Sequence, residues 1–288
     1  MRAVAGPGRW AWGLSGLAVT AALAVPGTYL ITMVQVSSIQ ARPVAIATRT
    51  VTVPQPVISL SVQSYGGQVR VTAGTVSRVQ VTERIVYDPQ AGGPPAVAES
   101  VSGGRLSLGE PACAGADCVV DFTVTVPSAV GVTVDTQGGP VAVSGVADTT
   151  VDSGGGPVRI TQVTGPLTVR TGGGPLILNE VAGPLRADTS GGTLAAQGIT
   201  AVTAILSTGG GPAQVAFSAA PDSVTISTGG GPATLRVPGG PYRLTADSDG
   251  GPEIIGIATD PAARVSIEVT SGGGPILVAP ASGSGGAP

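Results

Sequence analysis

A Gly-Gly-Pro tripeptide recurs along the second half of this chain at a nearly constant interval. Seven copies keep this interval, and in an eighth place, Gly191-Gly192-Thr193, threonine replaces the proline. The third positions are separated by 17, 18, 18, 19, 20, 20 and 23 residues. Unrelated loops would not keep such a period, so the interval indicates stacked repeats. The seven copies that keep the interval are Gly138-Gly139-Pro140, Gly155-Gly156-Pro157, Gly173-Gly174-Pro175, Gly210-Gly211-Pro212, Gly230-Gly231-Pro232, Gly250-Gly251-Pro252 and Gly273-Gly274-Pro275.

Each repeat contains two short segments in which aliphatic residues occupy every second position. Val158 with Ile160 follows one corner, and Leu167 with Val169 follows the next. Alternation with a period of two places such side chains on one face of a β-strand. Two strands and two corners per repeat predict one coil of a single-stranded β-solenoid made of 17–20-residue coils. In that interpretation glycine supplies positive φ at the corners and proline opens the next strand.

The N-terminal segment is predicted to be a transmembrane anchor. Residues 1–9 form a short cytoplasmic segment with Arg2 and Arg9, and residues 10–36 are uncharged, mostly apolar and long enough to span a bilayer as a helix. A signal peptide is the alternative, because Ala22-Leu23-Ala24 fits a cleavage site. Either interpretation predicts that the rest of the chain is exported. With the retained anchor, the chain is a single-pass protein of the bacterial cell membrane whose C-terminal part is extracytoplasmic.

The exported part divides into four predicted segments. Residues 37–56 contain three prolines and are predicted to be a linker. Residues 57–135 are predicted to be a β region with longer strands that could cap the solenoid and hide its edge. Residues 136–280 are the solenoid repeats, and residues 281–288 form a flexible tail rich in Ala, Gly and Ser.

Cys113 and Cys118 are the two cysteines of the chain, separated by four residues. Since the compartment outside the membrane is oxidising, a local disulfide is expected between them. A redox-active dithiol is the alternative, but the C-x-x-C spacing and the thioredoxin-like context of such sites are absent.

The composition excludes several classes of function. The chain has no His, and all 14 of its basic residues are Arg. Histidine-assisted nucleophiles, histidine metal sites and lysine-dependent phosphate loops are therefore excluded. The exported part has a net charge of −6, which opposes nucleic-acid binding. We expect no catalytic residues, no cofactor and no bound metal.

Charged residues stand directly before several corners. Asp135, Asp152, Arg170 and Asp188 occupy equivalent places in four successive repeats, so Arg170 should lie between Asp152 and Asp188 in a stack. This column of charges could contact a ligand. Alternatively, it could be a solvated face on which Arg170 compensates the charge of its neighbours.

Asp247-Ser248-Asp249 is a second candidate, for a carboxylate pair or a cation site, although a solvated turn explains it as well.

The arrangement resembles the bacterial putative-adhesin β-strand-repeat family. The resemblance lies in the apolar anchor followed by residues 57–62 (VISLSV) and 66–71 (GGQVRV), in the Cys pair that leads into residues 119–127 (VVDFTVTVP), and in residues 217–224 between two corners. It covers about residues 10–279. The family implies an all-β, solenoid-like domain at the cell envelope and supplies no activity.

We therefore expect a non-catalytic, membrane-anchored extracytoplasmic β-repeat protein, an adhesin or envelope scaffold that binds a surface protein or glycan. Two alternatives stay open. Solenoids can carry polysaccharide-active sites on one face, although such a site needs clustered acids and bases. An accessory of envelope sensing or signalling would have to use the short cytoplasmic segment.

Overall fold

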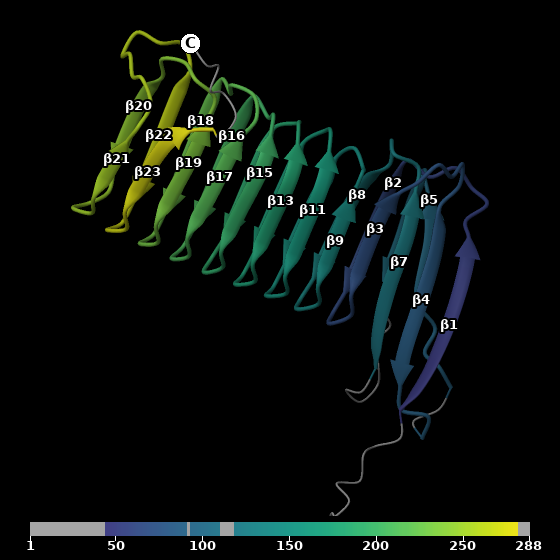
Figure 1. Ribbon diagram of the computed structural model, residues 1–288. Helices are drawn as coiled ribbons and strands as arrows, with labels where there is room; N and C mark the ends of the chain where they lie inside the picture. The colour runs from purple at the N-terminus through teal and green to yellow at the C-terminus, as the bar shows by residue number, and fades with distance from the viewer. Residues whose placement is uncertain (1–43, 91–92, 110–117, 282–288) are drawn as a thin grey trace, which may run out of the picture. The chain divides into compact units, whose positions relative to one another are not determined.

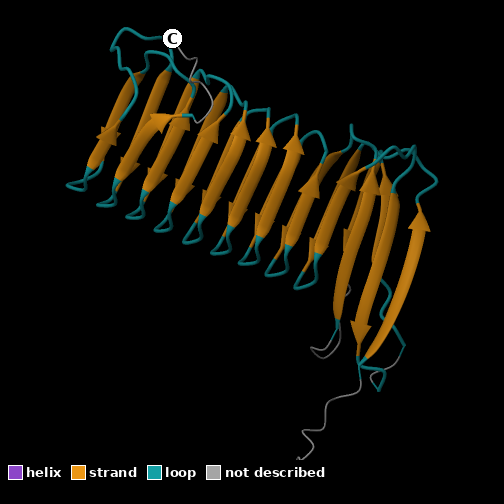
Figure 2. Cartoon of the chain, in the orientation of Figure 1, coloured by secondary structure: helices purple, strands orange, loops and turns teal. Residues whose placement is uncertain are grey.

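The computed structural model describes residues 44–90, 93–109 and 118–281. They form 23 strands in two sheets and contain no helix (Figure 1; Figure 2). The predicted all-β fold is confirmed. The predicted cytoplasmic segment 1–9 and anchor 10–36, and the tail after Ala281, lie outside the described residues. In the part that is described, no helix is long and apolar enough to cross a membrane.

The larger sheet, called sheet I below, has 12 strands. Its strands run parallel to their neighbours, except in the pairs that β4 makes with β1 and β7. In spatial order they are β1 (Ala45–Thr52), β4 (Gln80–Tyr87), β7 (Val119–Val126), β3 (Val69–Ala73), β9 (Val141–Ser144), β11 (Val158–Val163), β13 (Leu176–Val181), β15 (Leu194–Ile199), β17 (Ala213–Phe217), β19 (Ala233–Val237), β23 (Ile276–Pro280) and β21 (Glu253–Ile255).

The second sheet, sheet II, has 11 strands and is parallel except for the pair β5–β6. In spatial order they are β20 (Arg243–Asp247), β22 (Ser266–Ser271), β18 (Ser223–Thr228), β16 (Thr203–Thr208), β14 (Leu185–Thr189), β12 (Leu167–Thr171), β10 (Thr149–Ser153), β8 (Gly131–Thr136), β2 (Ser59–Ser64), β6 (Arg105–Gly109) and β5 (Ala98–Ser102).

Each repeat contributes one strand to each sheet, and this two-strand unit is called a rung below. Equivalent residues of successive rungs are paired, as where Val158 lies between Val141 and Leu176. In the central rungs every second side chain points between the sheets, and most of these side chains belong to one continuous hydrophobic cluster. The interior is therefore narrow, and small aliphatic residues fill it.

The spatial order of the rungs differs from their order in the chain at both ends. The rung β2–β3 comes first in the sequence, yet it lies between β6–β7 and β8–β9. At the other end, β22–β23 lies between β18–β19 and β20–β21. Sequential stacking, which the period predicts, is therefore wrong at the ends. Exchanged rungs keep the same alternation of side chains, so periodicity cannot reveal their order.

The strands that close the N-terminal end also differ from expectation. Strand β1 lies inside the predicted linker 37–56 and pairs with β4 over its whole length. The prolines that suggested a linker flank this strand, and residues 44–53 between them contain none. Within the predicted capping region 57–135, β2 and β3 are interior rungs. The end itself is formed by β1, β4 and β5.

Close packing explains the glycines at the end of each corner. A Cβ added at Gly174 would collide with the backbone carbonyl of Gly156 in the neighbouring rung, whereas a Cβ at Gly173 would meet nothing within 4 Å. Strands about 4.8 Å apart leave no room for a side chain between such backbones. The prediction that corner glycines supply positive φ is wrong for most of them. Among the corner glycines, positive φ occurs at Gly230, Gly250 and Gly273.

The corner prolines open the strands of sheet I. The carbonyl oxygen of Pro157 accepts a hydrogen bond of 2.9 Å from the amide of Val141, and that of Pro175 accepts one of 2.9 Å from the amide of Val158. The ladder therefore uses the proline carbonyl, which proline retains, and does not require the N–H that proline lacks.

A column of buried hydroxyl groups runs along the same corner inside the stack. Thr208 Oγ1 donates to the carbonyl oxygen of Gly211 at 2.5 Å, and Thr228 Oγ1 donates to that of Gly231 at 2.6 Å. Thr171 Oγ1 has no hydrogen-bond partner. The sequence shows a small polar residue before each corner, and alternation places it on the same inward face as the aliphatic residues of its strand. The nine buried residues are Ser64, Thr136, Ser153, Thr171, Thr189, Thr208, Thr228, Ser248 and Ser271.

Two threonine-to-valine substitutions should separate bonded from unbonded hydroxyls in this column. Thr208→Val removes the hydrogen bond to Gly211 and is expected to lower the free energy of unfolding by about 1 kcal/mol. Thr171→Val removes a buried hydroxyl without a partner and is expected to be neutral or stabilising. Denaturant unfolding of both variants tests this. Equal losses would contradict the hydrogen-bond assignment.

Candidate functional site

The charged column predicted before the corners exists on the outer face of sheet II. Parallel pairing places Asp152 between Asp135 and Arg170, and Arg170 between Asp152 and Asp188. Arg170 Nη1 lies 3.8 Å from Asp152 Oδ1, and both side chains are about half exposed, at 58% and 49%. An exposed pair at this distance contributes about 0–1 kcal/mol. The predicted position of Arg170 is therefore confirmed, but the pair is a weak surface contact.

A shallow groove of about 640 Å³ follows the column where sheet II turns into the glycine corner. Its walls combine Asp135, Asp152, Arg170 and Asp188 with the corner backbone. Asp188 is engaged by its own strand, because its Oδ2 lies 3.1 Å from Nε of Arg186. The groove is thus open and mixed in charge, unlike the enclosed, convergent pockets typical of enzymes.

The second candidate, Asp247 and Asp249, is a turn. Asp247 Oδ1 accepts a hydrogen bond of 3.1 Å from the amide of Asp249, whose φ is +48°. This side-chain-to-backbone bond is typical of an Asx turn. Among the described residues, no group of three or more potential metal-ligating side chains is assembled, here or elsewhere.

Of the two cysteines predicted to form a disulfide, Cys118 is among the described residues. Cys118, directly before β7, is disulfide-bonded, and Cys113 lies outside the described residues.

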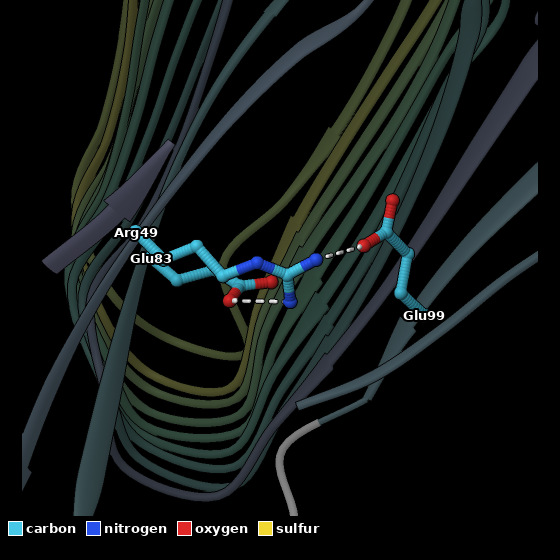
Figure 3. A network of polar contacts seen from close by, with 3 residues as sticks. All are labelled: Arg49, Glu83 and Glu99. Atoms are coloured by element: carbon cyan, nitrogen blue, oxygen red, sulfur yellow. Dashed lines mark hydrogen bonds and ion pairs between the residues drawn. The ribbon is translucent and has the colours of Figure 1, made fainter. Parts of the chain in front are cut away.

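A polar network closes the N-terminal end, and no sequence motif pointed to it. Glu83 on β4 of sheet I is 1% exposed and faces the interior. Arg49 on β1 pairs with it in register, with Nη1 3.7 Å from Glu83 Oε2. The other Nη of Arg49 donates to Glu99 Oε2 on β5 of sheet II at 3.4 Å. Figure 3 shows Arg49 between the two carboxylates. One arginine therefore bridges the edges of both sheets.

The alternation of inward and outward residues along β4 was the sequence signal that could have located Glu83. Val81, Glu83 and Ile85 occupy alternate positions, and the two aliphatic neighbours are buried. Neither carboxylate oxygen of Glu83 has a hydrogen-bond partner. Burial therefore raises the pKa of this carboxyl. Arg49 lowers it by a smaller amount, and Glu99 raises it further.

The raised pKa of Glu83 predicts that stability falls as the pH rises. The folded state holds the proton more tightly than the unfolded state, so this contribution is complete below the ordinary pKa of 4.5 and is lost as the pH passes through the raised value. Glu83→Gln should flatten the slope in that window, as measured by thermal unfolding from pH 4 to pH 8. Glu268→Gln, on the exposed face of β22, is the control. An unchanged slope in Glu83→Gln would contradict the assignment.

The opposite end also carries an inward-facing carboxylate. Glu253 on β21 pairs with Ile276, whose side chain belongs to the interior. Glu253 Oε1 accepts hydrogen bonds from the amide of Ser248 at 2.9 Å and from its Oγ at 3.0 Å. Inward charges at edge strands oppose pairing with a further strand. Both ends of the stack are therefore protected, which leaves the outer faces of the sheets as the extended surfaces.

Comparisons with known proteins concern the fold. No family model and no curated protein matches the chain. The crystal structure of a putative adhesin from Parabacteroides distasonis ATCC 8503 is 13% identical and covers 81% of this chain and 97% of its own, with a TM-score of 0.53. A putative adhesin from Bacteroides fragilis NCTC 9343 is 16% identical, with coverages of 81% and 97% and a TM-score of 0.44. The chain thus shares the fold of the Parabacteroides structure, as its resemblance to the β-strand-repeat family implied.

Proposed function

We propose that the chain is a non-catalytic, membrane-anchored β-solenoid protein of the bacterial envelope, an adhesin or scaffold that binds a surface partner through an outer sheet face. The name of the Parabacteroides structure supports the adhesin assignment. The apolar run of residues 10–36 supports the anchor, with the C-terminal part outside the cell.

The observation that carries this proposal is the geometry of the two outer faces. Twelve strands in one sheet and 11 in the other present regular rows of side chains over the whole length of the stack. At about 4.8 Å per rung, such rows suit repeated weak contacts with an extended partner. The candidate polar groups are spread along these rows and do not converge on one point.

The proposal is tested with the full chain in bacterial cells. A C-terminal epitope tag should be accessible to antibody on intact cells, and the protein should stay with the membrane during a carbonate wash. Leu23→Arg places a charge within the apolar run, which costs about 3 kcal/mol for insertion, and should release the protein. Crosslinking on intact cells should then capture an envelope protein or glycan. Release of the parent chain by carbonate would overturn the anchor, and crosslinking that captures no envelope component would overturn partner binding.

A further inference from the structure

The outer face of sheet I carries exposed arginines that have no acidic partner. Arg70 on β3, Arg159 on β11 and Arg236 on β19 point away from the interior and are exposed. No ion pair or hydrogen bond engages these three side chains within the residues that the structure describes. The unpaired arginines on this face therefore stand out in a chain whose net charge is −3.

The acids on the same face are already engaged. Asp121 lies 3.0 Å from Arg84 Nη1 and also accepts a hydrogen bond of 2.8 Å from the amide of Gln68. Glu180, at the end of β13, accepts a hydrogen bond of 3.0 Å from Gln162 Nε2. On sheet II, by contrast, the arginines of the central rungs are paired with aspartates. Within the described residues, Arg105 and Arg243 on sheet II are also unpaired, but they lie near opposite ends of that sheet, so the longer series of unpaired arginines is on sheet I.

The three arginines lie along one line across the strands. Arg70 and Arg159 are both register partners of Ala142, one on each side of it, and such partners form one row across the strands. The two arginines are therefore two rungs, about 10 Å, apart. Arg236 is four rungs beyond Arg159, about 19 Å away, in the adjacent row. The outward residues between Arg159 and Arg236 are uncharged except for Glu180, which accepts the hydrogen bond from Gln162. The uncharged ones are Ile177, Asn179, Ala195, Gln197, Gln214 and Ala216.

A groove of about 790 Å³ lies on the C-terminal part of this line. Its outer walls include Gln197, Gln214, Thr234 and Arg236. Amide and hydroxyl groups can donate to and accept from sugar hydroxyls, and a guanidinium group can hold a carboxylate in a bidentate manner. The groove therefore offers the two kinds of contact that an acidic sugar needs.

We infer that the outer face of sheet I binds a linear anionic polysaccharide that runs across the strands. Carboxylates of the polymer lie at Arg70, Arg159 and Arg236, and its hydroxyl groups contact the uncharged polar side chains between them. This inference rests on the proposed function and names the partner class. Three cations spread over seven rungs are too sparse for an anionic membrane, which selects clusters of about four to eight basic residues.

Binding of polygalacturonate by the full chain in detergent micelles tests the inference, with dextran of equal length as the neutral polymer. Polygalacturonate should bind and dextran should not, and binding should weaken steeply as salt shortens the screening length below about 8 Å. The triple variant Arg70→Gln, Arg159→Gln, Arg236→Gln should bind at least about tenfold more weakly, since each exposed charge contact contributes roughly two- to fivefold.

A second triple variant keeps the change in net charge and moves it to the other face. Arg105→Gln, Arg186→Gln and Arg243→Gln alter exposed arginines of sheet II and should leave the affinity within about twofold. Thermal unfolding should confirm that both variants are folded. Equal losses in the two variants, or no binding by the parent chain, would overturn the inference. The adhesin proposal would survive either result if crosslinking on cells still captures another envelope component.

Discussion

Gly174→Ala is expected to lower the free energy of unfolding by about 2–4 kcal/mol, although it adds a single methyl group. The added Cβ would collide with the backbone carbonyl of Gly156 and would approach the carbonyl carbon of the same residue to 2.6 Å. Both neighbours are backbone atoms of the corner between β10 and β11, and these two strands are fixed by their ladders, so neither atom can rotate away as a side chain could. In an unfolding experiment, the melting temperature should fall by roughly 6–12 °C.

The adjacent residue provides the matched control. Gly173→Ala makes the same chemical change one position earlier, where an added Cβ meets nothing within 4 Å and φ is not positive. Its effect should be within about 0.5 kcal/mol, and it can be slightly stabilising because alanine restricts the unfolded chain. If both variants lose stability equally, close stacking is not the reason for the glycine at position 174.

Much of this fold could be predicted because one physical constraint repeats. Alternation in each repeat determines which side chains face inward, and equal spacing brings equivalent residues into register. The placement of Arg170 between Asp152 and Asp188 followed from these two facts alone and is confirmed. Periodicity is thus sufficient for local pairing in the central rungs.

The ends could not be predicted in the same way, because what distinguishes them is contact with solvent. The outermost rung at the C-terminal end contains Glu253 at an inward position and leaves Ile254 62% exposed. Such a rung would be costly inside the stack, where an unpaired charge would be buried. The exchange of rungs therefore moves the more polar unit outward. An inward-facing carboxylate in a single repeat is the sequence signal that could have revealed this.

The networks at the two ends depend on pairs that are distant in sequence. Arg49 and Glu83 come from strands that pair antiparallel, whereas Glu99 comes from the opposite sheet. No spacing rule connects the three residues. Only the three-dimensional closure of the N-terminal end places one guanidinium group between two carboxylates.

Deletion of one complete repeat, residues 157–174, is expected to leave a cooperatively folded protein. The deletion removes β11 and β12, so β9 meets β13 and β10 meets β14. Equivalent residues stay in register because Val151 pairs with Val169, and Val169 pairs with Ala187. The stability of a stack is approximately a sum over rungs and their interfaces. Circular dichroism and thermal unfolding of the shortened chain should therefore show native β-structure and a single transition, at a modestly lower temperature.

Deletion of half a repeat, residues 157–165, is expected to have a much larger effect. It removes only β11, so β12 would follow the glycine corner where a strand of sheet I is required. Each later strand would then face the wrong sheet of the preceding rungs, and the glycine corners on the two sides of the junction could not stack. An interface of about four buried aliphatic side chains contributes roughly 6–12 kcal/mol, comparable to the whole net stability of a domain. Loss of the single transition is therefore expected. If the half-repeat variant were as stable as the whole-repeat variant, a glycine corner would not need to stack on another glycine corner.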